Sequence, residues 1–182
     1  AGSTRSNSTD DNGKTCFERV VDSVQPDILL LQDIAKVQTK GFYDYLKCNF
    51  NYTMEKRDSS LLTLCSKKYA SKFRQLNASD LIEILPSCHR DQISSHKLTN
   101  IQVIVINAEL CIINVYLTPT RNGGWDSIFN TLVILMDTLV DQYQDLICAG
   151  DFNTIMNYKK CKNEYYFETQ KNRAQSMYDF LE

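Results

Sequence analysis

The chain has 182 residues, a formal net charge of −2 and a hydrophobic fraction of 43%. That length suffices for one domain with a sizeable core, and the near-neutral charge argues against the strongly basic class of nucleic-acid-binding proteins. A nucleic-acid substrate is compatible with this charge, because a bound metal ion can supply the positive charge that a phosphate requires. No apolar run approaches the roughly 18 residues that a membrane helix needs, so we expect no membrane partner.

Hydrophobic periodicity predicts that helices and strands alternate along most of the chain. Residues 1–13 are polar and carry no hydrophobic pattern, so we expect a flexible lead-in to a single domain that covers 14–182. In chain order the pattern then predicts a helix at 14–24, a buried strand at 28–31, a short helix near 42–46 and a strand at 60–65.

The segment 75–99 is mixed and polar, and it predicts a loop with one helical turn near 80–85. The runs 101–106 and 110–117 are rich in strand-forming residues and are separated by Asn-Ala-Glu, which predicts a hairpin. Beyond them the pattern predicts a helix at 128–139, a buried strand at 146–149 and a final helix at 174–181. Together these elements predict a layered α/β sandwich with mixed β-sheets flanked by helices.

Seven cysteines are scattered along the chain. Their number is odd and no Cys-x-x-Cys pair occurs, which is typical of free thiols in a reducing compartment and not of a disulfide framework. We therefore expect an intracellular protein, whether cytoplasmic, nuclear or mitochondrial. The sequence points to no particular protein partner.

Polar side chains stand at three places where a predicted strand ends. Asp33 comes directly after the first buried strand. Asn114 and Tyr116 share one face of their strand, because successive side chains of a strand point to opposite faces. Asp151 and Asn153 alternate onto one face in the same way at the end of the last predicted strand. These ends are therefore candidates for a functional site.

Oxygen ligands of this kind suit phosphoryl chemistry. Mg²⁺ prefers hard oxygen ligands, takes only one or two carboxylates and keeps several of its waters. The ion neutralises the phosphate and helps to orient the nucleophile, while a base such as His or Asp activates the water. Gly150, directly before Asp151, allows the backbone to approach another group closely. We therefore expect Mg²⁺ (or Mn²⁺) as the cofactor.

Two motifs in register resemble those of the endonuclease/exonuclease/phosphatase superfamily. Gly-Asp-Phe-Asn at 150–153 is similar to the GDFN motif of that family, and Pro-Asp-Ile-Leu-Leu-Leu-Gln-Asp at 26–33 is similar to its PDIxxLQE motif. Asn-Val-Tyr at 114–116 lies where members carry N-x-Tyr or N-T-His. The ordered set spans about 14–167 and is closest in pattern to the 2′,5′-phosphodiesterase and deadenylase branch.

The resemblance implies a Mg²⁺-dependent phosphodiesterase or 3′–5′ exoribonuclease that acts on RNA or an oligonucleotide, and it implies roles for single residues. Asp33 takes the place of the glutamate metal ligand, and Asp151 binds the metal or orients the attacking water. Asn153 and Tyr116 contact the scissile phosphate. Asn114 belongs to the same motif, where it supports the site or contacts the substrate.

The residues alone leave other interpretations open. Asp33 is also suited to cap a helix, and Tyr116 to be an ordinary aromatic residue of a strand. Asp151 and Asn153 are also typical of a turn with capping side chains. Trp125 either stacks on a base of the substrate or anchors its turn on the core.

The chain departs from the family pattern at several positions. Asp33 replaces a glutamate, which shortens the side chain by about 1.5 Å. Asp126 and Asn130 stand where that branch carries positive charge near the phosphate. The family closes with a strand that carries an Asp-His pair, and no Asp-His dipeptide occurs in these 182 residues. We expect His89 and His96 to be exposed loop residues.

These departures predict a domain that is incomplete at its C-terminal end, and they leave three hypotheses for the function. The first is a Mg²⁺-dependent phosphodiesterase or nuclease that needs an Asp-His unit from elsewhere. The second is a catalytically inactive relative, a pseudoenzyme that acts as a binding module. The third is the endonuclease domain of a retrotransposon polyprotein, which shares the Asn-Val-Tyr and GDFN pattern.

Overall fold

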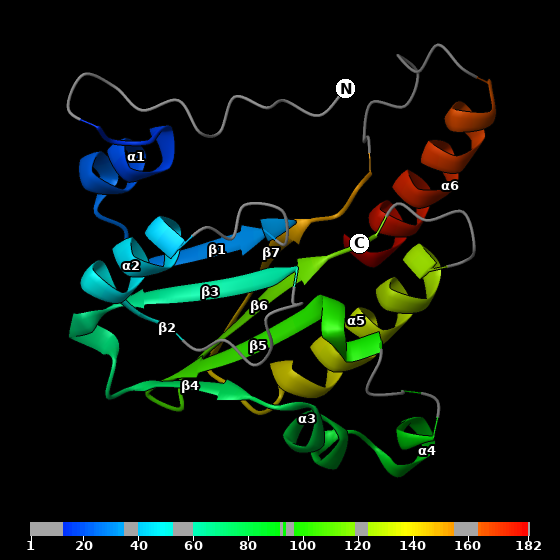
Figure 1. Ribbon diagram of the computed structural model, residues 1–182. Coiled ribbons are helices and arrows are strands. Elements are labelled where there is room, and N and C mark those ends of the chain that lie inside the picture. The colour runs from blue at the N-terminus through cyan, green and yellow to red at the C-terminus, as the bar shows by residue number, and fades with distance from the viewer. Residues whose placement is uncertain are drawn as a thin grey trace.

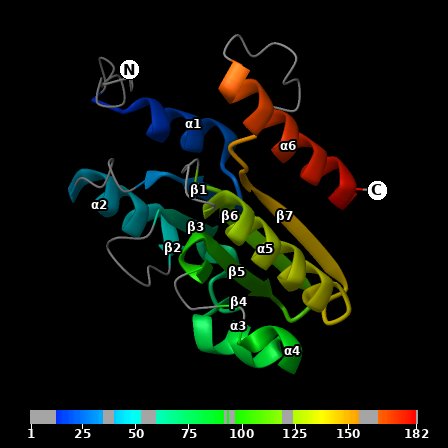
Figure 2. The same cartoon turned by 90° about the vertical axis from the view of Figure 1, so that its right-hand side faces the viewer.

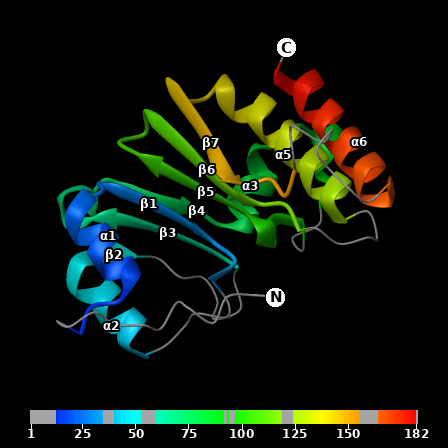
Figure 3. The ribbon, with the colours of Figure 1, turned by 90° about the horizontal axis from the view of Figure 1, so that it is seen from above.

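The computed structural model describes residues 13–34, 40–52, 60–91, 93, 97–118, 124–154 and 164–181. Two β-sheets pack face to face, and helices cover the outer face of each (Figures 1 and 3). The helices are α1 (Cys16–Val24), α2 (Lys40–Asn49), α3 (Ala78–Ile84), α4 (Ser87–Arg90), α5 (Gly124–Val140) and α6 (Glu164–Leu181). The strands are β1 (Ile28–Gln32), β2 (Phe50–Tyr52), β3 (Leu61–Ser66), β4 (Phe73–Leu76), β5 (Ile101–Ile106), β6 (Leu110–Tyr116) and β7 (Asp145–Asp151). Short 3₁₀ helices lie at Lys67–Tyr69 and Lys97–Asn100.

The first sheet has the strand order β1-β3-β2, and both of its strand pairs are antiparallel. On its outer face, α1 and α2 bury an apolar cluster that includes Leu29 and Leu31 of β1. Ile28 and Leu30 alternate with them and contact the second sheet. Strand β1 is therefore covered on both faces, which explains its continuous apolar run.

The second sheet has the order β4-β5-β6-β7. Its first three strands are antiparallel neighbours, whereas β7 runs parallel to β6. Helices α5 and α6 lie on its outer face (Figure 2), where Leu132, Leu135 and Leu139 of α5 are fully buried. Because β6 and β7 are parallel, their carboxyl ends lie side by side at the same end of the sheet.

The layer between the two sheets is apolar at one end and polar at the other. At one end Ile104, Ile106 and Ile112 form an apolar cluster with Ile28 and Leu30. Toward the carboxyl ends of β1 and β6 the facing side chains become polar, and this part of the layer is formed by Gln32, Thr63, Gln102 and Asn114. The interior is therefore polar next to the strand ends that carry the candidate site.

The predicted α/β sandwich is confirmed, with differences at short elements. Strands β2 and β4 were not predicted, because each has only three or four residues and no alternating pattern. The segment 75–99, predicted as a loop with one helical turn near 80–85, contains α3 at that place and in addition the end of β4 and the helix α4. His89 is not an exposed loop residue but a half-buried residue of α4, and His96 lies outside the described residues.

Some predictions concern residues that the structure describes only in part. The lead-in at 1–13 lies almost wholly outside the described residues. Six cysteines are described, and all six are free thiols. Among the helices in the described ranges, none combines the length and the apolar character that crossing a bilayer requires.

Candidate functional site

The carboxyl ends of β1, β6 and β7 point to the same end of the sandwich (Figures 1 and 3). Tyr116 and Asp151 are direct neighbours across the parallel pair β6 and β7. One residue further on, the Leu117 amide donates a hydrogen bond of 2.9 Å to the Asp151 carbonyl oxygen, which extends this pairing. Strand β1 contacts both β6 and β7 and brings Asp33 to the same end.

A tight turn after β7 orients the next side chain. Asn153 has φ of 46°, a left-handed conformation that asparagine tolerates better than most residues. Its backbone N–H donates to Asp151 Oδ1 at 2.9 Å, and its side-chain Nδ2 donates to the Leu117 carbonyl at 2.8 Å. These two bonds tie Asn153 to the ends of both strands and hold the Asp151 carboxylate in place.

The close approach of β7 to β6 depends on Gly150. A Cβ atom on this residue would lie 1.9 Å from the Val115 carbonyl oxygen, far inside van der Waals contact. The close backbone approach expected at Gly150 is therefore present, and it sets the position of Asp151, the next residue.

The charge of Asp33 acts on Tyr116 together with that of Asp151, so Asp33 lies near these two residues. Asp33 is exposed and adopts φ of 51° directly after β1. Burial raises the pKa of Tyr116, and the negative charges of Asp33 and Asp151 raise it further, whereas a hydrogen bond with the Asn153 side chain acts in the opposite direction. Asp33, Tyr116, Asp151 and Asn153, all predicted as site residues, are thus neighbours in space.

Asn114 lies on the same face of β6 as Tyr116, but it is buried between the two sheets. Its side chain is 0% exposed. Its Oδ1 accepts a hydrogen bond of 2.7 Å from Gln32 Nε2, and its Nδ2 donates to Thr63 Oγ1 at 3.2 Å. A fully buried amide with these partners is not placed to touch a substrate, which argues against the predicted substrate contact of Asn114.

Trp125 anchors the turn and does not present a face for stacking on a base. It is only 1% exposed, and its ring stacks on Phe129 with 4.8 Å between centroids. Its Nε1 donates a hydrogen bond of 2.7 Å to the Phe152 carbonyl, inside the turn that carries Asn153. The interpretation of Trp125 as a substrate-binding residue is therefore wrong, because the ring is part of the core.

Arg173 of α6 supports this turn from the other side, and no sequence pattern pointed to it. Its Nη1 donates a hydrogen bond of 3.1 Å to the Asn153 carbonyl, and its guanidinium lies 5.3 Å from the centroid of the Trp125 ring. The residue is 8% exposed, so its charge acts from within the protein. Its guanidinium therefore lies directly behind the turn that carries Asn153.

The side chains at the strand ends suit a hard divalent cation. Asp33 and Asp151 are exposed carboxylates, and their charges act together on Tyr116. Mg²⁺ needs only one or two carboxylates together with its waters. Within the described residues, no group of three or more His, Cys, Asp or Glu side chains gathers in a way that could hold a metal. Asp33 and Asp151 therefore supply no more than the one or two carboxylates that Mg²⁺ takes.

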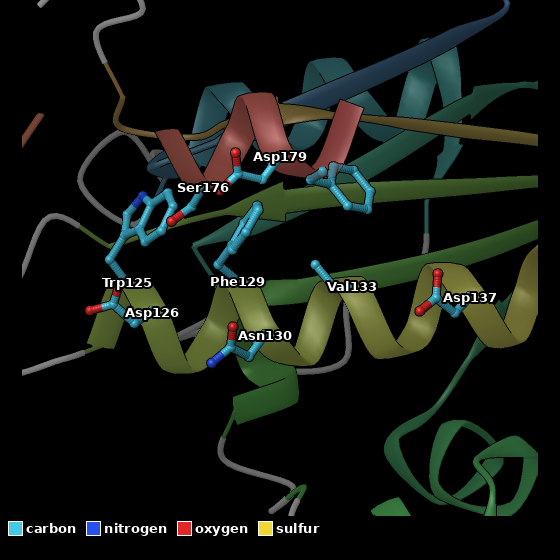
Figure 4. A pocket seen from close by; sticks show the side chains of 9 residues that line it. Trp125, Asp126, Phe129, Asn130, Val133, Asp137, Ser176 and Asp179 are labelled. Atoms are coloured by element: carbon cyan, nitrogen blue, oxygen red, sulfur yellow. The ribbon is translucent and has the colours of Figure 1, made fainter. Parts of the chain in front are cut away.

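A separate groove lies between α5 and α6 and has a volume of about 490 Å³. Figure 4 shows that α5 contributes Phe129 and Val133 to it, while α6 contributes Asp179. Asp126, Asp137 and Asp179 make its rim acidic. Like charges repel, so this groove is poorly suited to a phosphate, and the strand-end cluster remains the candidate site.

Comparison with solved structures identifies the fold. The chain matches the crystal structure of TDP2 from Caenorhabditis elegans with a TM-score of 0.51 and 18% identity, over 75% of this chain and 40% of that chain. The chain has the endonuclease/exonuclease/phosphatase-type fold. A humanized D. rerio TDP2 matches with a TM-score of 0.47 and 15% identity, over 75% of this chain and 53% of that one. No protein-family model and no curated protein matches.

The endonuclease/exonuclease/phosphatase-type fold agrees with the two motifs that predicted it. The chain spans 40% of the length of the nematode TDP2 structure. At 18% identity the likeness concerns the fold. The assignment to the 2′,5′-phosphodiesterase and deadenylase branch stays a prediction from the sequence motifs.

Proposed function

We propose that the chain is the metal-binding part of a Mg²⁺- or Mn²⁺-dependent phosphodiesterase or nuclease. The observation that supports this proposal is the convergence of Asp33, Tyr116, Asp151 and Asn153 at the carboxyl ends of β1, β6 and β7. The motifs further support a 2′,5′-phosphodiesterase or a 3′–5′ exoribonuclease of the deadenylase type. The substrate would then be RNA or an oligonucleotide.

Asp33 and Asp151 are the residues that would hold the cation. When bound, the cation neutralises the phosphate charge and helps to orient the attacking water. Asp151 is prepared for this role, because the Asn153 N–H fixes one of its carboxylate oxygens at 2.9 Å. A ligand whose rotamer is fixed in advance loses less conformational freedom when it binds.

Tyr116 and Asn153 are the residues that would contact the phosphate. Because the pKa of Tyr116 is raised, its hydroxyl stays protonated at neutral pH and can donate a hydrogen bond to a phosphate oxygen. The hydrogen bond with Asn153 lowers the pKa, as expected when the amide donates to the phenol oxygen. The phenol hydrogen is then left for the substrate.

A water-activating base is a separate requirement. The family resemblance places an Asp-His pair at this step, and an active enzyme of this type needs that pair in addition to these 182 residues. His89 belongs to α4 and is not part of the strand-end cluster. Arg173 and Trp125 keep the turn of Asn153 in place and do not take part in proton transfer.

A second candidate function is that of an inactive relative that binds nucleotides or a protein through the same site. Aspartate in place of glutamate at position 33 and the lack of an Asp-His dipeptide favour it. The two candidates differ in one measurement. Cleavage of short oligoadenylates in Mg²⁺ that is lost in Asp151→Ala supports the phosphodiesterase, whereas binding without metal dependence or turnover supports the binding module.

Substitution of Asp33 by asparagine should abolish the stabilisation of the chain by Mn²⁺. Asparagine has the same shape and tolerates the left-handed backbone at this position, so the fold should persist while the charge is lost. A ligand that binds only the folded state at 100 times its dissociation constant stabilises it by about 2.7 kcal/mol. We expect a Mn²⁺-dependent rise in Tm for the wild type and none for Asp33→Asn, as measured by differential scanning fluorimetry.

The matched control is Asp27→Asn. Asp27 is an exposed aspartate directly before the same strand, at the end away from the site, where its Oδ1 accepts a hydrogen bond from Ser66 Oγ. This variant should keep the full Mn²⁺ response. A normal response in Asp33→Asn would remove Asp33 from the metal site.

Tyr116→Phe should weaken the binding of a phosphodiester without changing the response to Mn²⁺. The variant removes one hydrogen bond to a charged oxygen, which contributes about 1.5–3 kcal/mol, so affinity should fall by at least tenfold. We would measure binding of a phosphorothioate oligoadenylate by fluorescence anisotropy in Ca²⁺. Tyr45→Phe is the control, since that hydroxyl bonds Asp22 on α1; equal loss in both variants would argue against a phosphate contact by Tyr116.

A further inference from the structure

A chain of polar side chains crosses the interior between the two sheets. Gln32 Nε2 donates to Asn114 Oδ1 at 2.7 Å, and Asn114 Nδ2 donates to Thr63 Oγ1 at 3.2 Å. Thr63 Oγ1 donates to Gln102 Oε1 at 2.7 Å, and Gln102 Nε2 donates to Gln75 Oε1 at 3.0 Å. The five residues come from β1, β6, β3, β5 and β4, so the network links both sheets.

The network is unusual for its position. Thr63 and Asn114 are 0% exposed and Gln102 is 8% exposed. The same layer is filled by isoleucine and leucine only a few residues away. Burying polar groups costs free energy unless every member finds a partner, and the hydrogen bonds of the network supply these partners. Here each side chain donates to the next in a single direction, away from Gln32.

This directionality fixes the orientation of the Gln32 amide. Flipping the amide would set its oxygen against Asn114 Oδ1, two acceptors facing each other. Nε2 therefore stays toward Asn114, and Oε1 points to the other side. Among the described residues, none donates a hydrogen bond to Gln32 Oε1.

Gln32 Oε1 is thus an oriented acceptor at the strand end that carries Asp33. Gln32 is the last residue of β1 and directly precedes Asp33. Its partner Asn114 lies two residues before Tyr116 on the same face of β6. A hydrated Mg²⁺ or Mn²⁺ keeps several waters, and each of these waters donates hydrogen bonds that need acceptors.

We infer that Gln32 is a positioning residue of the cation site, whose oxygen accepts a hydrogen bond from a water of the cation, and that Asn114 holds it in that orientation. This inference rests on the proposed function, because it takes a divalent cation as the occupant. Groups that orient the ligands of a metal typically affect its affinity by 10- to 100-fold. The network therefore acts on the site through one oriented oxygen atom.

The test is Mn²⁺ binding to the whole chain, measured by electron paramagnetic resonance of the free ion. Gln32→Met removes both amide groups at nearly constant volume and should weaken binding about tenfold. Gln75→Met is the matched control at the far end of the network, and it should leave the Mn²⁺ affinity within about twofold of the wild type, well below the tenfold effect of a positioning group.

A second readout needs no metal. In nuclear magnetic resonance spectra the Gln32 side-chain amide hydrogens should exchange slowly in the wild type. In Asn114→Leu they should exchange rapidly, and this variant should lose Mn²⁺ affinity to the same extent as Gln32→Met. A general loss of packing would instead weaken Mn²⁺ binding in Gln75→Met as well.

The outcomes separate this inference from the proposed function. If Asp33→Asn abolishes Mn²⁺ binding while Gln32→Met binds like the wild type, the cation site stands and the role of Gln32 is overturned. If Gln75→Met loses as much affinity as Gln32→Met, the network is structural and the inference is also overturned. A wild-type chain that binds no Mn²⁺ would overturn the inference together with the proposed cation site.

Discussion

Replacement of Gly150 by alanine should destabilise this protein more than a typical overpacking substitution does. The added Cβ would lie 1.9 Å from the Val115 carbonyl oxygen and 2.8 Å from its carbon. These are backbone atoms of the neighbouring strand, so no side-chain rotation relieves the clash and β7 has to move away from β6. Overpacking usually costs about 1–3 kcal/mol, and we expect a larger loss in the free energy of unfolding here.

Gly41→Ala is the matched control for this substitution. Gly41 lies near the start of α2, and a Cβ added there would have no atom within 4 Å. Alanine is a better helix former than glycine by about 1 kcal/mol, so this variant should be as stable as the wild type or more so. Urea denaturation followed by circular dichroism measures both variants. Wild-type stability of Gly150→Ala would show that β6 and β7 are further apart than described.

The position of the candidate residues at strand ends could be anticipated from the sequence because it depends on short-range rules. Side chains alternate along a strand, and Tyr116 and Asp151 end neighbouring strands. Gly150 and Asn153 are residue types suited to a close approach and to a left-handed turn. These rules hold whatever packs above the sheet, so the strand ends were predictable without knowledge of the rest of the fold.

The roles of Asn114 and Trp125 were not predictable, because each depends on a distant partner. Asn114 is buried by Gln32, which is 82 residues away in sequence, on the opposite sheet. A strand pattern shows which residues share a face, but not whether that face meets solvent or another sheet. Trp125 packs in the core, where Phe152, 27 residues further on, accepts the hydrogen bond of its indole N–H.

Arg173 was missed for a related reason. Arginine is among the residues least often buried, so a helical pattern assigns it to the solvent side. The predicted helix began at residue 174, ten residues after the true start of α6, and left Arg173 outside it. The contact between Arg173 Nη1 and the Asn153 carbonyl, across 20 residues, reveals its place behind the site.

Truncation of Trp125 to alanine should reduce both the stability of the chain and its response to Mn²⁺. Burial and stacking of a tryptophan typically contribute about 3–5 kcal/mol in such a substitution. The variant also leaves the Phe152 carbonyl without its donor and removes the ring that lies 5.3 Å from the Arg173 guanidinium. Both changes loosen the turn that holds Asn153 and, through it, the Asp151 carboxylate.

Two further variants separate the contribution of the turn from that of the core. Trp125→Phe keeps a stacked ring but loses the hydrogen bond to Phe152, which should cost about 1–3 kcal/mol. Leu139→Ala removes a fully buried side chain near the opposite end of α5 and should cost about 2–5 kcal/mol. If the turn transmits the effect, Mn²⁺ affinity measured at a temperature where all variants are folded falls in both Trp125 variants and stays at the wild-type value in Leu139→Ala. Equal losses of affinity in Trp125→Phe and Leu139→Ala would mean that the site responds only to global stability, since the hydrogen bond to the turn is intact in the leucine variant.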